Sequence, residues 1–228
     1  MNLLAIDTSS IACTIAVKTA DSVIERHEEQ PREHTRLLMP MIRDALQEAG
    51  VELTDLDAIV LGNGPGSFIG MRIAASVSQG LAYGARLQII PVSSLAAVAA
   101  EVFATSSAAE VAVAQDAHMS EVYLGLFSRG KDGIPVPMAA ERLHREGRID
   151  EFSAENTGQR VAAGEGWQRY PDLKTINEPL FSEYSDVLYP HAKYLLSLAD
   201  RKAAIEPRDI SPSYLRQKVA EKPVKAGS

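Results

Sequence analysis

The chain has 228 residues, of which 46% are hydrophobic and 23% charged, a composition typical of a globular protein with room for two lobes. Its formal net charge of -7 disfavours unaided binding to RNA, because an acidic protein repels the phosphate backbone. No apolar run approaches the roughly 20 residues that cross a bilayer, no signal-peptide pattern is present and Cys13 is the only cysteine, so we expect a cytoplasmic protein without membrane contact, disulfide or cysteine-bound metal.

Three short strands are predicted at the start of the chain, over residues 2–6, 11–17 and 23–27. Turns as short as those between them join antiparallel neighbours, so the chain is expected to open with a three-stranded meander. A helix is predicted over residues 35–49, where apolar residues recur at helical spacing. Gly50 then ends this helix, because glycine readily adopts the left-handed conformation that follows a last turn.

Strands and helices alternate in the next part of the chain. We predict strands over residues 58–61 and 87–90, a helix over residues 70–83 between them, and a further helix that Ser93 caps. Three antiparallel strands followed by alternating helices and strands are typical of the ribonuclease H-like lobe of actin-like (ASKHA) proteins. The predicted fold class is therefore α/β, with two lobes whose mixed sheets are flanked by helices.

A boundary between the lobes is expected near the small and polar residues 105–109. We assign residues 1–106 to an N-terminal ribonuclease H-like lobe and residues 107–204 to a smaller, degenerate second lobe. Residues 205–228 form a C-terminal tail that is expected to pack back on the first lobe. Residues 129–186 show weak periodicity and yield no element prediction. The elements predicted elsewhere in the second lobe are strands over 111–115 and 122–127 and a helix around 188–199.

A glycine-rich loop over residues 62–70 (GNGPGSFIG) lies between a predicted strand and a predicted helix. Glycines allow close approach of a ligand and a helix start offers free N–H groups, so the loop fits an anion such as phosphate. It lacks the lysine of a Walker loop and the spacing of the dinucleotide fingerprint. A tight turn that brings the helix close to the sheet is the alternative. The residues of this possible degenerate nucleotide or phosphate loop are Asp7, Thr8, Ser9, Gly64, Gly66 and Ser67.

The helix predicted over residues 70–83 is unusually poor in charge. From residue 73 to residue 82 it has no Lys, Arg, Asp or Glu, and small side chains alternate with apolar ones. A surface helix normally exposes such charges, so both faces of this helix are expected to be covered. One cover is the sheet, and the other is either another part of this chain or a partner subunit.

Six segments together resemble one protein family. They are residues 4–9 (LAIDTS), 34–40 (HTRLLMP), 64–73 (GPGSFIGMRI), 93–95 (SSL), 116–123 (DAHMSEVY) and 212–216 (PSYLR). In this order and spacing they are similar to the TsaB family, also called YeaZ, over nearly the whole chain. Two positions depart from the usual pattern of that family, with Ile69 where threonine is common and His118 where arginine is common.

The resemblance implies an actin-like fold and a non-catalytic subunit that binds and supports TsaD. The complex forms N6-threonylcarbamoyladenosine at position 37 of tRNAs that read ANN codons. TsaE joins this complex and TsaC supplies the activated threonylcarbamoyl group. The chain is expected to form a homodimer when alone and to meet tRNA only through the complex. It needs no cofactor of its own, since ATP and metal are expected on the partner subunits.

The resemblance also places the partner interface on the first two helices of the N-terminal lobe. The residues that it implies there are Leu37, Leu38, Met41, Ile42, Met71, Ala74, Val77, Ser78 and Leu81.

An independent ATP-dependent phosphotransferase of actin-like fold is the alternative function. Such enzymes usually have a glycine in the turn after the first strand, and the turn that follows Asp7 here has none. Asp7 and Asp116 each end a predicted strand, where either a catalytic carboxylate or a turn-forming one is expected. No two of the five histidines lie three or four residues apart, so no metal-binding pair on a helix is predicted. Ser9 and Ser67 have no recognisable partner base, so a hydrolase is not supported.

Overall fold

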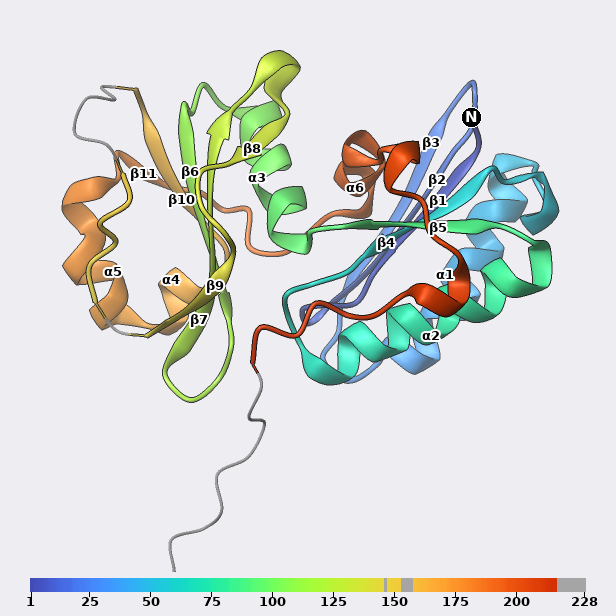
Figure 1. Ribbon diagram of the computed structural model, residues 1–228, viewed down its shortest axis with the longest axis horizontal. Helices are drawn as coiled ribbons and strands as arrows, with labels where there is room; N and C mark the ends of the chain where they lie inside the picture. Colours follow the sequence, from blue (N-terminus) through green and yellow to red (C-terminus); the bar gives the residue numbers. More distant parts are fainter. Residues whose placement is uncertain (146, 153–157, 217–228) are drawn as a thin grey trace, which may run out of the picture.

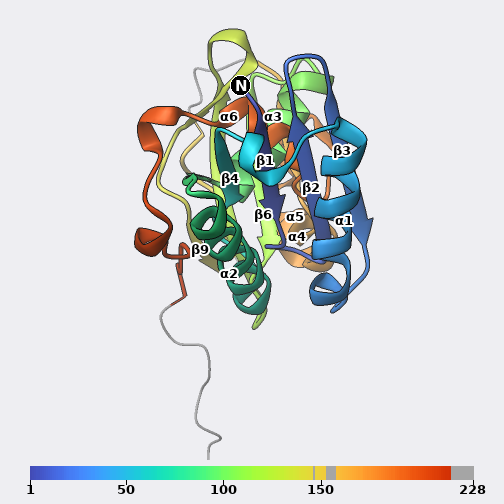
Figure 2. The same ribbon diagram turned by 90° about the vertical axis from the view of Figure 1, so that its right-hand side faces the viewer.

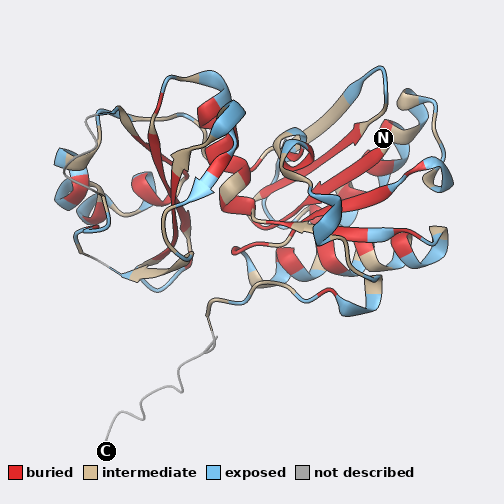
Figure 3. Ribbon diagram, turned by 45° about the horizontal axis from the view of Figure 1, so that its top comes forward, coloured by how far each residue is buried: buried red, intermediate tan, exposed pale blue. Residues whose placement is uncertain are grey.

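The computed structural model of the chain describes residues 1–145, 147–152 and 158–216. Two lobes lie side by side, each built around one β-sheet with helices on its faces (Figure 1). Buried residues concentrate in the two sheets and on the inner sides of the helices (Figure 3). Both sheets contain parallel and antiparallel pairs, so the predicted α/β class with two mixed sheets is confirmed.

The first sheet has the strand order β3-β2-β1-β4-β5. β1 lies at its centre and is buried along its whole length, which explains why its sequence, LLAID, is almost entirely apolar. It pairs antiparallel with β2 and parallel with β4, so the opening meander continues directly into the parallel part of the sheet. The strands are β1 (Leu3–Asp7), β2 (Ala12–Lys18), β3 (Val23–Glu29), β4 (Ala58–Gly62) and β5 (Gln88–Val92).

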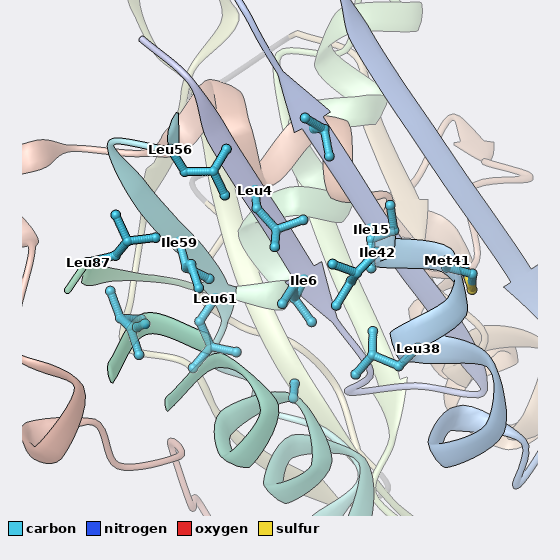
Figure 4. Close-up of a cluster of buried hydrophobic side chains, with 14 of the residues drawn as sticks. Leu4, Ile6, Ile15, Leu38, Met41, Ile42, Leu56, Ile59, Leu61 and Leu87 are labelled. Carbon is cyan, nitrogen blue, oxygen red and sulfur yellow. The ribbon is translucent and has the colours of Figure 1, made fainter. Parts of the chain in front are cut away.

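Three helices cover the faces of the first sheet. α1 (His34–Ala49) and α2 (Phe68–Ala85) lie on the same face (Figure 2). Their apolar stripes pack with Leu4 and Ile59 in one buried cluster (Figure 4). α6 (Ala192–Leu198) covers the opposite face in a second cluster. The sheet is therefore buried on both sides, and the helices leave only their outer sides to solvent.

The second sheet has the strand order β11-β10-β6-β7-β8, with β9 also paired to β7. α3 packs on one face, and Trp167 of α4 is fully buried against the other. The strands are β6 (Glu110–Asp116), β7 (Glu121–Arg129), β8 (Pro135–Pro137), β9 (Arg142–Arg145), β10 (Arg160–Ala163) and β11 (Glu183–Tyr184). The helices are α3 (Ser94–Thr105), α4 (Gly166–Arg169) and α5 (Pro171–Asn177).

Short 3-10 turns and loops connect these elements. The turns are η1 (Leu53–Asp55), η2 (Lys131–Gly133), η3 (Glu178–Leu180), η4 (Arg201–Ala203) and η5 (Pro207–Asp209). Among the described residues, no helix is both long enough and apolar enough to cross a membrane.

The sequence signals for helix ends agree with the structure at two positions. Gly50 has φ +67° and ends α1, and the Ser93 hydroxyl accepts a hydrogen bond from the Ala96 N–H at 3.1 Å, as an N-cap does. The helix predicted around 188–199 begins only at Ala192, because Pro190 disfavours helical backbone at the residue before it. The weakly periodic residues 129–186 contain strands of two to four residues, too short to leave a periodic signal.

Two helices pack with a different lobe from the one to which the expected boundary between residues 106 and 107 assigns them. α3 precedes this boundary in sequence, yet it packs against β6, β7 and β10 of the second sheet. α6 follows the boundary, yet it packs against β1 and β2 of the first sheet. The chain therefore passes from the first lobe to the second before α3 and returns before α6.

The return from the second lobe contains a stacked pair of histidines. His27 of β3 and His191 have ring centroids 3.8 Å apart and rings inclined by 3°. Burial, helped by the charge of His191, lowers the pKa of His27. The hydrogen bond with Glu25 raises the pKa of His191. The pKa values of the two stacked imidazoles are thus shifted in opposite directions.

The difference in stability between the wild type and a variant in which one of these histidines is replaced with phenylalanine should therefore depend on pH, with opposite signs for the two positions. The lowered pKa of His27 means that the wild type loses stability relative to His27→Phe as pH falls below 6.5, the ordinary value. The raised pKa of His191 means that the wild type loses stability relative to His191→Phe as pH rises above 6.5. Urea unfolding between pH 5 and pH 8 measures both differences, and equal slopes for the two variants would contradict this assignment.

Candidate functional site

Asp7 is fully buried at the end of β1 and is held by the chain itself. Its Oδ1 accepts the backbone N–H of Ser9 at 2.6 Å, and its Oδ2 accepts the Ser94 hydroxyl, also at 2.6 Å. Burial raises the pKa of this carboxyl, and the hydrogen bonds from Ser94 and Ser9 oppose that rise. The first candidate carboxylate is therefore enclosed in the structure rather than presented to a ligand.

The glycine loop packs directly onto the turn that follows β1. A Cβ atom at Gly62 would lie 1.9 Å from Asp7 Oδ2, one at Gly66 would lie 2.2 Å from the Ser9 carbonyl oxygen, and one at Gly70 would lie 1.8 Å from the Thr8 carbonyl oxygen. No side chain fits at these separations, so glycine is required for close approach of backbone to backbone. Here the approaching group is the chain's own turn.

Hydrogen bonds close the same contact. The Ser67 N–H donates to the Ser9 carbonyl at 2.6 Å, and the Thr8 hydroxyl donates to the carbonyl of Gly70 at 2.7 Å. The Gly70 N–H donates to the Ser67 hydroxyl, which caps α2, and the Gly64 N–H donates to the Ser94 hydroxyl. These N–H groups, which a phosphate would need, already have partners within the chain.

The structure thus brings together all six residues predicted for the degenerate phosphate loop, and adds others. Ser94 joins Asp7 to Gly64, and His34 at the start of α1 places its Nε2 2.9 Å from the Ser10 carbonyl oxygen. The family motifs contain both His34 and Ser94, but the hydrogen bond of Ser94 to Asp7 joins residues 87 positions apart, which no local pattern predicts. Neither contact offers chemistry to a substrate.

Asp116, the second candidate carboxylate, ends β6 and is also engaged. The Tyr170 hydroxyl donates to its Oδ1 at 2.6 Å, Arg169 Nε lies 2.9 Å from its Oδ2, and His118 Nδ1 lies 3.2 Å from the same oxygen. The carboxylate is therefore neutralised by the Arg169 guanidinium of its own lobe. Within residues 1–145, 147–152 and 158–216, no group of His, Cys, Asp or Glu side chains is suited to hold a metal ion.

The implied partner-interface residues divide into two groups. Six of them are buried, most of them in the cluster between the helices and the chain's own sheet (Figure 4), because the apolar stripe of each helix marks its inner side. These six are Leu38, Met41, Ile42, Met71, Ala74 and Ser78. The other three, Leu37, Val77 and Leu81, lie partly exposed at the edge of that packing. A partner on these helices would therefore meet mainly other residues.

The outer side of α2 carries one exposed charged side chain, Arg72, and is otherwise uncharged. Ile69 is 70% exposed and Tyr83 is 83% exposed, which is unusual for large apolar side chains. Gly80 and Gly84 lie on the same side, and a Cβ at either would meet no atom within 4 Å. Glycine in a helix interior costs roughly 0.5–1 kcal/mol relative to alanine, and nothing within the chain makes use of these two glycines.

A groove continues this surface towards α1. It has a volume of about 600 Å³ and lies between the C-terminal half of α1, η1 and α2. Its apolar lining comes from Met39, Leu46, Val51, Leu53 and Leu81. The outer side of α2 and this groove together form the α1/α2 surface, defined by Met39, Leu46, Ile69, Ile73, Val77, Gly80, Leu81, Tyr83 and Gly84.

Comparison with known proteins gives consistent matches. Residues 22–135 match the family model of TsaD, described as tRNA N6-adenosine threonylcarbamoyltransferase. The tRNA threonylcarbamoyladenosine biosynthesis protein TsaB of Escherichia coli K12 is 37% identical over 226 residues, covering 97% of both chains. The protein of the same name from Haemophilus influenzae is 34% identical over 234 residues, covering 97% of this chain and 96% of that one.

Solved structures agree with these sequence matches. YeaZ from Pseudomonas aeruginosa superposes with a TM-score of 0.85 at 36% identity, covering 94% of this chain and 99% of that one. A crystal structure described as an uncharacterized protein with similarity to peptidase YeaZ, from the same organism, superposes with a TM-score of 0.86 at the same identity and coverage.

The glycine contacts predict opposite effects of one substitution at two sites. Gly66→Ala should destabilise the fold by roughly 2 kcal/mol or more, because its Cβ has no room beside the Ser9 carbonyl. Gly80→Ala should stabilise it by about 0.5–1 kcal/mol, because its Cβ has open space and alanine favours the helix. Thermal and urea unfolding of the two variants measure this, and a Gly66→Ala variant as stable as the wild type would contradict the close packing.

Proposed function

The chain belongs to the TsaB family of tRNA threonylcarbamoyladenosine biosynthesis proteins, and we propose that it acts in this pathway as a non-catalytic subunit that binds and supports TsaD. The enclosure of Asp7 beneath the glycine loop is the main support for a role without chemistry. A subunit of this kind contributes to a reaction by binding, so a surface suited to a protein partner is the feature to look for.

The α1/α2 surface supports this role. A helix surface on which Arg72 is the one charged side chain and Ile69 and Tyr83 are exposed is typical of the centre of an interface, where charged residues are depleted. Gly80 and Gly84, one helical turn apart, allow the backbone of a partner helix to approach closely, which would offset their cost to α2. A standard interface of about 1,600 Å² would cover this surface and the adjoining groove.

TsaD is the partner that this surface fits best in our proposal. The TsaD family model matches residues 22–135, a range that includes α1 and α2, so TsaD is expected to carry a related pair of helices. Related surfaces can pair about a pseudo-twofold axis, as identical ones do in a twofold dimer. By the same reasoning, the chain alone would pair with a second copy of itself.

The remaining components follow from the same proposal. TsaE joins the pair, TsaC supplies the activated group, and the reaction takes place in the cytoplasm on tRNA held by the complex. The chain has a net charge of -7, which supports contact with tRNA only through its partners. ATP and metal belong to the partner subunits, since Asp7 and Asp116 are both engaged within this chain.

One substitution placed on each lobe tests the interface. Ile69→Glu places a charge on the α1/α2 surface at the start of α2, where glutamate is compatible with the helix dipole. Ile176→Glu makes the same change on α5 of the second lobe, where the isoleucine is 48% exposed. Calorimetric titration with purified TsaD should show at least about a tenfold loss of affinity for Ile69→Glu, since burying a charge costs more than 1.4 kcal/mol.

The control variant Ile176→Glu should bind TsaD as the wild type does, and circular dichroism should show that both variants are folded. Wild-type affinity in Ile69→Glu and in a second variant, Gly80→Glu, would refute the proposed surface. Absence of any binding between the wild-type chain and TsaD would refute the proposed function itself.

The alternative phosphotransferase function makes a separate prediction. The purified chain should show no ATP turnover, because Asp7 is enclosed and the N–H groups of Gly64, Ser67 and Gly70 already donate to acceptors within the chain. A phosphate-release assay measures this over hours at saturating ATP and Mg²⁺. Turnover that Asp7→Asn abolishes and Asp116→Asn preserves would establish the phosphotransferase instead.

A further inference from the structure

Residues 205–216 return from α6 along the first lobe and end on the second. Ile205 pairs with Ile89 of β5 through two backbone hydrogen bonds of 2.9 and 3.0 Å. Ile210 is 8% exposed and belongs to the buried cluster beneath α1 and α2. Gln79 of α2 donates to the Pro207 carbonyl at 2.9 Å. The first half of this segment is thus anchored to the first lobe.

The next residues bind the start of the glycine loop and of α2. The Asn63 side chain donates to the Ser211 carbonyl at 3.0 Å, and the Ser213 N–H donates to the Asn63 carbonyl at 3.1 Å. Tyr214 stacks obliquely on Phe68, with ring centroids 5.5 Å apart. The Tyr214 hydroxyl also accepts from Arg72 Nε at 2.9 Å. These contacts fix the segment where it leaves the first lobe.

Its last two described residues belong to the second lobe. Leu215 packs against the buried cluster beneath α3. The Arg216 guanidinium donates to the Ala117 carbonyl at 2.9 Å and to the His118 carbonyl at 3.3 Å, and forms an ion pair with Glu121. The Arg216 and Glu121 side chains are only 16% and 13% exposed, so water screens the pair weakly. Arg216 is thus bound to the turn between β6 and β7 by hydrogen bonds and an ion pair.

The described chain also crosses between the lobes before α3 and before α6. A pair of connections leaves two bodies free to rotate about the line that joins them, and this is how hinged lobes close around ligands. Figure 1 shows the C-terminal segment, in red, crossing below both connections. We propose that residues 211–216 are a latch that holds the two lobes at one fixed angle.

The latch explains why contacts that carry no chemistry occur at both ends of one short segment. Asn63 and Phe68 belong to the glycine loop, so the latch also contacts that loop. With the latch in place, the lobes neither open nor close, and α2 keeps its position relative to the second sheet. Without it, the lobes would still be joined by the two connections, by the packing of α3 against α6 and by the hydrogen bonds of Ser94, and the angle between them would be less restricted.

Two shortened chains and one substitution test the latch. The chain ending at Ile210 lacks residues 211–216 but keeps Ile210 in the first lobe. The chain ending at Arg216 is the matched control, because it keeps every contact described above. Arg216→Ala removes only the grip on the β6–β7 turn, and Arg208→Ala is its control, since the Arg208 side chain is 85% exposed.

The distance between two spin labels, one on each lobe, measures changes in the angle between the lobes. Cysteines replace the exposed residues Asp21 and Asp150, which lie on different lobes. Cys13 does not react with the label, because it is buried and burial raises the pKa of its thiol to about 12. Dilution with unlabelled chain removes distances between molecules. The full chain, the chain ending at Arg216 and Arg208→Ala should each give one narrow distance distribution.

The chain ending at Ile210 and the Arg216→Ala variant should each give a broadened distribution or a second distance. Circular dichroism establishes that each is folded, and if the chain ending at Ile210 does not fold, Arg216→Ala decides alone. An unchanged narrow distribution in the folded variants would overturn the latch. The measurement uses the isolated chain, so its outcome is independent of whether TsaD binds.

Discussion

The hydroxyl of Ser94 is the contact on which the first lobe's functional end depends. It donates to the buried Asp7 at 2.6 Å and accepts from the Gly64 N–H at 3.1 Å. One side chain therefore joins the end of β1, the start of α3 and the glycine loop. A buried carboxylate without such partners would be costly, so the loop, the turn and the helix stabilise one another as a unit.

The glycine loop and the start of α2, which could together bind a phosphate, here hold α2 against the turn that follows β1. Gly66 and Gly70 bring backbone close to backbone, and the start of α2 is capped by Ser67 rather than by a ligand. The result is a fixed position for α2, which also sets the outer side of that helix. Rigid placement of a surface lowers the entropy lost when a partner binds. In the proposed role, the contacts that enclose Asp7 are also the ones that fix the position of the binding surface.

The two lobes are also held together by contacts along the boundary between them, here called the seam. α3 packs on the second sheet and α6 on the first, and the two helices contact each other where the lobes meet. The stacked pair of His27 and His191 lies at the return connection, and Arg216 lies at the far end of the C-terminal segment. Contacts spread over the whole seam favour a single arrangement of the lobes.

The sequence by itself determined the elements whose signals are local. Strand alternation, the helix end at Gly50 and the cap at Ser93 depend on neighbouring residues, and the six family motifs identified the fold. Only the tertiary structure decided the use of each surface. An apolar stripe marks whichever side of a helix is covered, so Leu38 and Met41 gave the same signal for the sheet as for a partner. The glycine loop is closed by a turn more than fifty residues away in sequence, and such long-range contacts leave no periodicity to read.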